Sequence, residues 1–103
     1  MTTSRSVVRR IAVDHPSFAG HFPGQPLLPG VLLLAEVMEA LHGADLPAPP
    51  GQAYEMRNVK FLCPVRPGDE IRIELQCETE RARFTVQCRD QVAASGQIAW
   101  SAP

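Results

Sequence analysis

The residues with the clearest chemical potential lie in segment 20–30, which contains His21. Three prolines and three glycines among these eleven residues exclude a continuing helix or a central strand, so the segment is predicted to be a shaped loop. An imidazole titrates near neutral pH, which makes His21 a candidate general base. The alternative is that His21 is an ordinary surface or packing residue of this loop.

The loop leads directly into a second candidate group, the start of a helix. Residues 29–41 are almost wholly apolar and predict a helix that begins near Pro29 and is closed by Gly43. The first N–H groups of a helix have no partner within it and carry the positive end of the helix dipole. The amides of Gly30 and Val31 are therefore candidates for holding a negative charge that grows on a substrate oxygen.

Only three residues interrupt the apolar surface of this helix: Glu36, Glu39 and His42. The helix is therefore predicted to be buried and wrapped by the rest of the chain. The alternative is a polar stripe that faces solvent or a partner chain. The apolar run is shorter than the roughly 20 residues that cross a bilayer, so no membrane span is expected.

The remaining elements are predicted to be strands. Residues 6–14 form the first strand, and from residue 52 the apolar residues follow a period of two, with a turn at residues 64–69. A bulge near Arg57 and Asn58 would bring residues on both sides of it to the helix. The predicted inner residues of the four later strands are Tyr54, Met56, Val59, Phe61, Ile71, Ile73, Leu75, Cys77, Ala82, Phe84, Val86, Cys88, Val92, Ala94, Gly96, Ile98 and Trp100.

These elements predict an α+β fold in which an antiparallel sheet wraps one central helix, as a single domain over residues 1–103. An open antiparallel sheet has unpaired edges, so pairing with a second copy is expected. Ten basic and eleven acidic residues give a net charge of −1, and no basic stripe favours nucleic acid. The N-terminus has no apolar signal core, so a cytoplasmic location is expected.

The three cysteines, Cys63, Cys77 and Cys88, are odd in number and occupy strand-like positions. They are predicted to be reduced, structural thiols. Neither they nor His15, His21 and His42 have a recognisable zinc spacing, so no metal site is expected.

Two sets of residues resemble a known family. The first consists of GHFPG at residues 20–24, Pro26 and PGVL at residues 29–32, and the second of VKF at residues 59–61, PV at 64–65 and PGD at 67–69. They resemble, in the same order, the hotdog-fold 3-hydroxyacyl-[acyl-carrier-protein] dehydratases of fatty-acid synthesis (FabZ/FabA-like). The resemblance covers residues 14–69, and beyond them it is only one of alternating strands.

The resemblance implies a lyase that removes water from a 3-hydroxyacyl thioester and leaves the trans-2-enoyl product. Such a reaction needs a base for the proton next to the carbonyl, a donor for the departing hydroxyl, and dipoles for the carbonyl oxygen. His21 would be the base, while Gly30, Val31 and Phe22 would contact the substrate. The acyl chain would be carried on the phosphopantetheine of acyl carrier protein or coenzyme A, with no metal or redox cofactor. It would lie in an apolar tunnel between two subunits, and the resemblance implies that the His and the acid come from different subunits.

The sequence departs from this family at the acid. The dehydratases have a Glu or Asp fourteen residues after the His, and that position is Ala35 here. Glu36 would point about 100° away, whereas Glu39 lies on nearly the same face, one turn further along. Glu39 is therefore the preferred substitute, and its carboxyl is expected to be shielded by apolar neighbours.

Three alternatives remain open at this point. A partner chain of different sequence could supply the acid, in a hetero-oligomer rather than a homodimer. The chain could be a non-catalytic hotdog subunit that keeps the tunnel and lacks the acid. It could also be a hotdog thioesterase, in which a carboxylate and water cleave the thioester, although the GHFPG loop resembles dehydratases rather than thioesterases.

Overall fold

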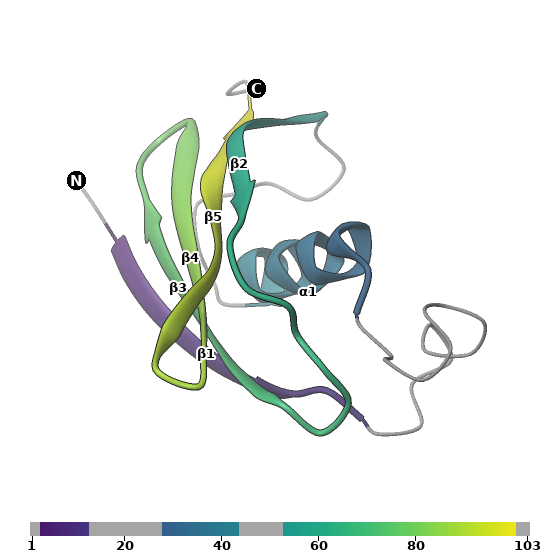
Figure 1. Cartoon of the computed structure of the whole chain (residues 1–103). Coiled ribbons are helices and arrows are strands. Elements are labelled where there is room, and N and C mark those ends of the chain that lie inside the picture. The colour runs from purple at the N-terminus through teal and green to yellow at the C-terminus, as the bar shows by residue number, and fades with distance from the viewer. Residues whose placement is uncertain (1–2, 13–27, 44–52, 101–103) are drawn as a thin grey trace.

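The computed structural model describes residues 3–12, 28–43 and 53–100, which form one antiparallel sheet and one helix (Figure 1). In chain order the elements are β1 (Thr3–Arg10), α1 (Gly30–Gly43), β2 (Tyr54–Phe61), β3 (Glu70–Cys77), β4 (Arg81–Cys88) and β5 (Gln91–Trp100). The strands lie in the order β1-β3-β4-β5-β2, and each neighbouring pair is antiparallel. The predicted α+β class is confirmed.

The centre of the sheet follows the alternation of the sequence. Strands β3 and β4 pair along their length without a shift in register. Ile73, for example, lies opposite Val86, and Leu75 lies opposite Phe84. Their inward side chains are all buried, as predicted, because successive residues of a strand point to opposite faces. These side chains are Ile71, Ile73, Leu75, Cys77, Ala82, Phe84, Val86 and Cys88.

The edge strand β1 differs from its prediction at both ends. It begins at Thr3 instead of residue 6 and ends at Arg10, while the predicted end at residue 14 lies outside the described residues. Its backbone pairs with β3 from Thr3 opposite Cys77 to Arg10 opposite Glu70. Ladder hydrogen bonds need no apolar side chain, so the polar residues that precede Ser6 extend the strand although the apolar pattern does not reach them.

Two bulges change which residues face the core. The predicted bulge in β2 is confirmed, because the register with β5 shifts between Arg57 and Lys60, and Asn58 has a φ of 54°. A second shift, between Val86 and Gln87 of β4, was not predicted; it makes Ala93 the extra residue of β5. Ala93 and Ala94 are consequently both buried. Val92, predicted to face inward, is 37% exposed, so that prediction is wrong.

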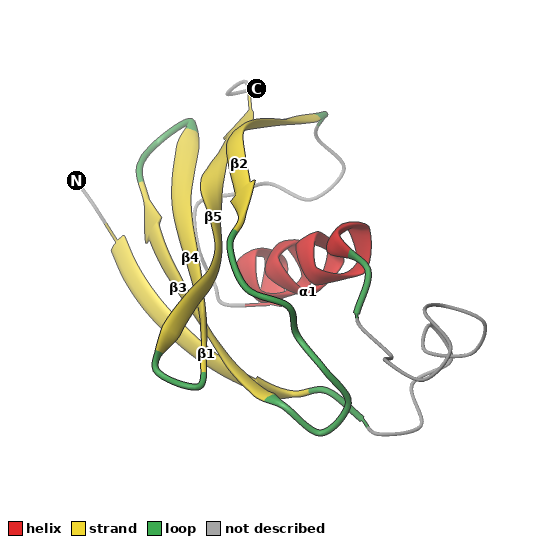
Figure 2. Ribbon diagram, viewed as in Figure 1, coloured by secondary structure: helices red, strands yellow, loops and turns green. Residues whose placement is uncertain are grey.

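Helix α1 lies against one side of the curved sheet (Figure 2). It buries Leu33, Val37, Ala40 and Leu41 against this sheet. The prediction that the rest of the chain buries the helix is wrong for one of its faces, because Val31 is 72% exposed and Ala35 is exposed too. A single sheet covers one face of a helix, so the apolar residues of the opposite face stay uncovered in one chain.

The end of α1 is attached to the sheet through aromatic residues. The Nε2 atom of His42 lies 2.9 Å from the hydroxyl of Tyr54, and the two rings meet edge to face. Tyr54 in turn meets Trp100 edge to face, with ring centres 5.9 Å apart. These contacts fix the C-terminal end of the helix over the start of β2 and the end of β5.

Candidate active site at the start of helix α1

The predicted site residues divide into those that the structure places and those that it does not. His21 and Phe22 lie outside the described residues. Gly30 and Val31 are the first two residues of α1, as predicted. Glu39 is exposed on the same helix, nine residues after Gly30, which corresponds to about 13 Å along the helix axis.

The first two amides of α1 differ from the next two in their hydrogen bonds. The carbonyl of Pro29 accepts hydrogen bonds from the amides of Leu32 and Leu33, at 3.0 and 3.1 Å, and so caps the next two donors. Within the described residues, no acceptor pairs with the N–H of Gly30 or Val31. The first turn also contains no acidic side chain that would neutralise the positive end of the dipole. This arrangement is suited to an oxygen that becomes negatively charged.

The ring of Phe61, which was predicted to face the helix, packs against Gly30 at this helix start, a specific contact that was not predicted. A Cβ atom built on Gly30 would lie 2.8 Å from Cζ of Phe61, so only glycine leaves room for the ring. Phe61 is nevertheless 53% exposed, and its chain neighbour Leu62 is 58% exposed. With Val31, these side chains give the helix start an apolar surround that suits an acyl chain or an apolar partner surface.

The contact between Gly30 and Phe61 predicts a coupled pair of substitutions. Gly30→Ala is expected to destabilise the protein by about 1 kcal/mol, because the half-exposed ring must move aside. In a Phe61→Ala background the same change is expected to be neutral or stabilising by up to about 1 kcal/mol, since alanine favours a helix over glycine. Urea unfolding of the four proteins measures this coupling. Equal effects of Gly30→Ala in both backgrounds would contradict the contact.

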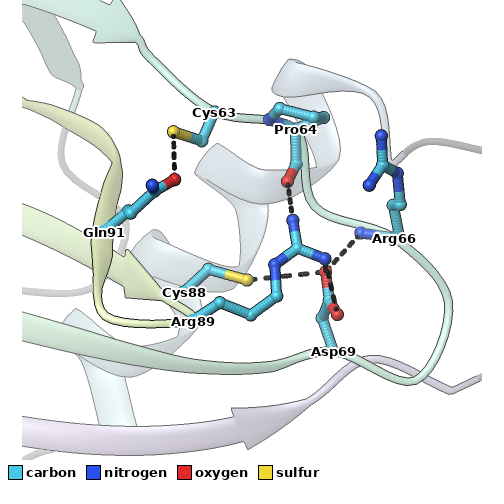
Figure 3. Close-up of polar contacts among 7 residues, drawn as sticks. All are labelled: Cys63, Pro64, Arg66, Asp69, Cys88, Arg89 and Gln91. Carbon is cyan, nitrogen blue, oxygen red and sulfur yellow. Dashed lines mark hydrogen bonds and ion pairs between the residues drawn. The ribbon is translucent and has the colours of Figure 1, made fainter.

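A polar cluster in the loop between β2 and β3 was also not identified from the sequence (Figure 3). The guanidinium of Arg89, in the turn between β4 and β5, lies 3.2 Å from the carboxylate of Asp69 and donates to the carbonyl of Pro64 at 3.2 Å. The same carboxylate accepts the amide of Arg66 at 2.8 Å. The side chain of Asp69 is only 13% exposed, so solvent screens this ion pair less than a surface pair.

The three cysteines are unpaired, as predicted, with Cys77 and Cys88 buried and Cys63 half-buried. Burial raises the pKa of the Cys77 and Cys88 thiols, so both stay protonated and are poor nucleophiles. Cys63 was predicted to lie on a strand, but it lies in the loop after β2. Its Sγ donates to Oε1 of Gln91 at 3.2 Å.

No cluster of three or more His, Cys, Asp or Glu side chains in residues 3–12, 28–43 and 53–100 has the arrangement of a metal site. Helix α1, with 14 residues, is too short to span a bilayer, and the described residues contain no other candidate span.

Comparison with solved structures supports the hotdog fold. The chain superposes with a TM-score of 0.82 on a chain of the dehydratase heterocomplex ApeI:P from Xenorhabdus doucetiae, at 25% identity, covering 99% of this chain and 95% of the other. It also superposes on a hot-dog-like protein from Thermanaerovibrio acidaminovorans with a TM-score of 0.67 and 16% identity, covering 95% and 78%. The predicted hotdog architecture is confirmed.

Sequence comparison identifies the family. The chain is 37% identical over 84 residues to the 3-hydroxyacyl-[acyl-carrier-protein] dehydratase FabZ of Haemophilus influenzae, covering 76% of this chain. It spans only 57% of the length of that relative. Residues 2–97 match the model of the ApeI-like family, described as ApeI dehydratase. This chain therefore belongs to the ApeI-like family of hotdog dehydratases.

Proposed function

We propose that the protein removes water from a 3-hydroxyacyl thioester and gives the trans-2-enoyl thioester. The observation that carries this proposal is the match of residues 2–97 to a dehydratase family. In the reaction the C2–H bond breaks, a double bond forms between C2 and C3, and the C3 hydroxyl leaves with a proton as water. No electron acceptor is needed, and the proposal includes no cofactor beyond the phosphopantetheine of acyl carrier protein or coenzyme A that carries the acyl chain.

The proposed mechanism assigns the base and the oxyanion donors to this chain. His21 takes the C2 proton, and the negative charge that develops on the thioester oxygen is held by the amides of Gly30 and Val31. These amides point out of the positive end of α1 and have no other acceptor in the described residues. Phe22 is assigned to the substrate-binding surface, together with the exposed ring of Phe61.

The acid of this mechanism is best supplied by a second chain. Glu39 lies about 13 Å along α1 from Gly30, and an extended Glu side chain cannot close that distance to a hydroxyl two carbons away from the bound carbonyl. Ala35 is closer to the amides and has no acid. A carboxyl that faces this helix start from a neighbouring subunit removes the difficulty, whether it is Glu39 of a second copy or an acid of another sequence.

The surface of the single chain supports such a partner. Strand β2 is at one edge of the sheet, and Phe61 and Leu62 at its end are exposed. The related ApeI:P structure is a heterocomplex, which favours a second hotdog chain of different sequence over an exact copy. We place this assembly in the cytoplasm, with acyl carrier protein as the proposed donor of substrate.

The direct test is to incubate the protein with 3-hydroxyacyl carriers of several chain lengths and to follow the enoyl product by mass spectrometry. The acyl-loaded carrier is expected to lose 18 mass units, because water leaves while the thioester bond remains intact. Release of free acid and free carrier thiol without enoyl product would contradict the proposal and favour the thioesterase.

The source of the acid is tested with Glu39→Gln, and with Glu36→Gln, three residues earlier on the same helix, as the matched control. If a second copy supplies Glu39, Glu39→Gln is expected to lower kcat about 100-fold or more, whereas Glu36→Gln keeps the rate. If another hotdog chain supplies the acid, the protein alone is inactive and activity appears on mixing. Loss of activity in Glu36→Gln alone would contradict the preference for Glu39.

A further inference from the structure

We propose that Asp69 and Arg89 are positioning residues that hold the start of helix α1, and with it the Gly30 amide, in its working place. Neither residue reaches the helix start itself. They act through the loop formed by residues 62–69, which we call the anchor loop. The catalytic part of this proposal rests on the proposed function, while the anchoring part is independent of it.

The anchor loop forms a hydrogen bond with the chain immediately before the helix. The amide of Leu28 donates to the carbonyl of Val65 at 2.8 Å, two residues ahead of Gly30. Leu28 and Val65 are both buried, with 8% and 2% exposure, so water does not compete for this hydrogen bond. A shift of Val65 is therefore transmitted to Leu28 and to the helix start.

The same loop is hydrogen-bonded to Ile11, the residue that follows β1. Ile11 donates its amide to the carbonyl of Asp69 and accepts the amide of Gly68, both at 2.8 Å. Gly68 has a φ of 82°, which a turn of this shape requires and which glycine adopts without strain. The chain on both sides of segment 13–27, in which His21 lies, is thus fastened to one loop.

The side chains of Asp69 and Arg89 give the anchor loop its shape (Figure 3). Arg89 spans the loop, because one nitrogen lies 3.2 Å from the Asp69 carboxylate and the other donates to the Pro64 carbonyl at 3.2 Å. The carboxylate also accepts the amide of Arg66 at 2.8 Å. Val65 lies between the residues held in this way, so its carbonyl is fixed from both sides.

Arg89 can do this because of the turn in which it lies. Arg89 and Asp90 have φ angles of 50° and 61° and connect Cys88 to Gln91, which are paired across the β4–β5 hairpin. A two-residue turn of this kind is short and matches the twist of its strands. The guanidinium is therefore presented to the anchor loop from a rigid part of the sheet.

The test compares Asp69→Ala and Arg89→Ala with Arg81→Ala as a matched control. Arg81 forms an ion pair with Glu78 at 2.9 Å, beyond the opposite end of β3, and does not contact the anchor loop. Amide hydrogen exchange is measured at Leu28 and Ile11. Both cluster variants are expected to exchange at least about tenfold faster at these amides, while Arg81→Ala leaves them unchanged.

Kinetics then separate positioning from general stability. At a temperature where all variants are folded, Asp69→Ala and Arg89→Ala are expected to lower kcat about 10- to 100-fold with little change in KM, because a displacement of ~1 Å at the reacting groups has an effect of this order. Arg89→Lys, which keeps the charge but has a single nitrogen, is expected to recover part of the rate.

Two results would overturn the inference: unchanged exchange at Leu28 and Ile11 in both cluster variants, or faster exchange accompanied by a full kcat. A parent protein that forms no enoyl product, alone or with a hotdog partner, would contradict the proposed function. In that case the exchange data still decide whether Asp69 and Arg89 anchor the helix start.

Discussion

Replacing His21 by alanine is expected to lower kcat/KM for enoyl formation about 100- to 10,000-fold, the range that a positioned general base contributes. The proton next to a thioester carbonyl is weakly acidic, so its removal needs a group that is unprotonated near neutral pH and can still accept a proton there. An imidazole meets both conditions. The measurement is the initial rate of enoyl formation over a range of substrate concentrations.

The control for this prediction is another histidine. His42 is exposed at the end of α1, and its ring contacts Tyr54 away from the helix start, so His42→Ala is expected to keep the catalytic rate. The two variants together separate loss of a base from loss of any imidazole. Full activity of His21→Ala, or equal losses in both variants, would contradict the assignment of His21.

Replacing Phe84 by alanine is expected to lower the free energy of unfolding by about 3–5 kcal/mol, the cost of removing a buried aromatic side chain. Phe84 is 1% exposed and lies on β4, the middle strand of the sheet. Its ring fills the space above Gly96, where an added Cβ would lie 2.8 Å from two ring atoms. The alanine would leave a cavity that these strands cannot close, and chemical unfolding measures the loss.

An exposed apolar side chain is the matched control for Phe84. Leu62 is 58% exposed, so Leu62→Ala is expected to change the stability of the single chain by no more than about 0.5 kcal/mol. Because small domains are stable by only about 5–15 kcal/mol, Phe84→Ala should also reduce the folded protein obtained on expression. A loss below about 1 kcal/mol for Phe84→Ala would contradict the packing described for this core.

The sequence predicts the fold well where burial alone decides the structure. The alternation along β3 and β4 gives the correct inner face, since both strands are fully paired and lie over the core. The alternation along β5 misassigns Val92, because the extra residue Ala93 makes the residues before it face the opposite side of the sheet. A bulge of this kind is determined by pairing with β4, which a periodic pattern within one strand does not contain.

The helix is predicted correctly in position and less well in environment. Gly43 ends it as expected, and its start at Gly30 follows from the proline-rich loop. The exposure of Val31 was not predicted, since an apolar residue on a helix indicates burial without saying whether the covering surface belongs to the same chain. Glu39 is exposed as well, so the described residues do not provide the shielding that was expected for its carboxyl.

The candidate site is only partly readable from the sequence. The amides of Gly30 and Val31 follow from the position of a helix start, a local feature. The contacts of Gly30 with Phe61 and of Asp69 with Arg89 join residues far apart in the chain, and each residue alone has the composition of an ordinary strand or turn. For the contact with Phe61, glycine at the first helical position is an available signal, because it indicates a close approach by another group.

The most direct test of the site at the start of α1 is a structure of the protein, with its hotdog partner if activity requires one, bound to a non-hydrolysable 3-hydroxyacyl pantetheine amide. The acyl carbonyl oxygen is expected within about 3 Å of the Gly30 amide nitrogen, with the imidazole of His21 beside C2. An acyl carbonyl bound away from the start of α1, or a His21 ring directed away from C2, would contradict this expectation.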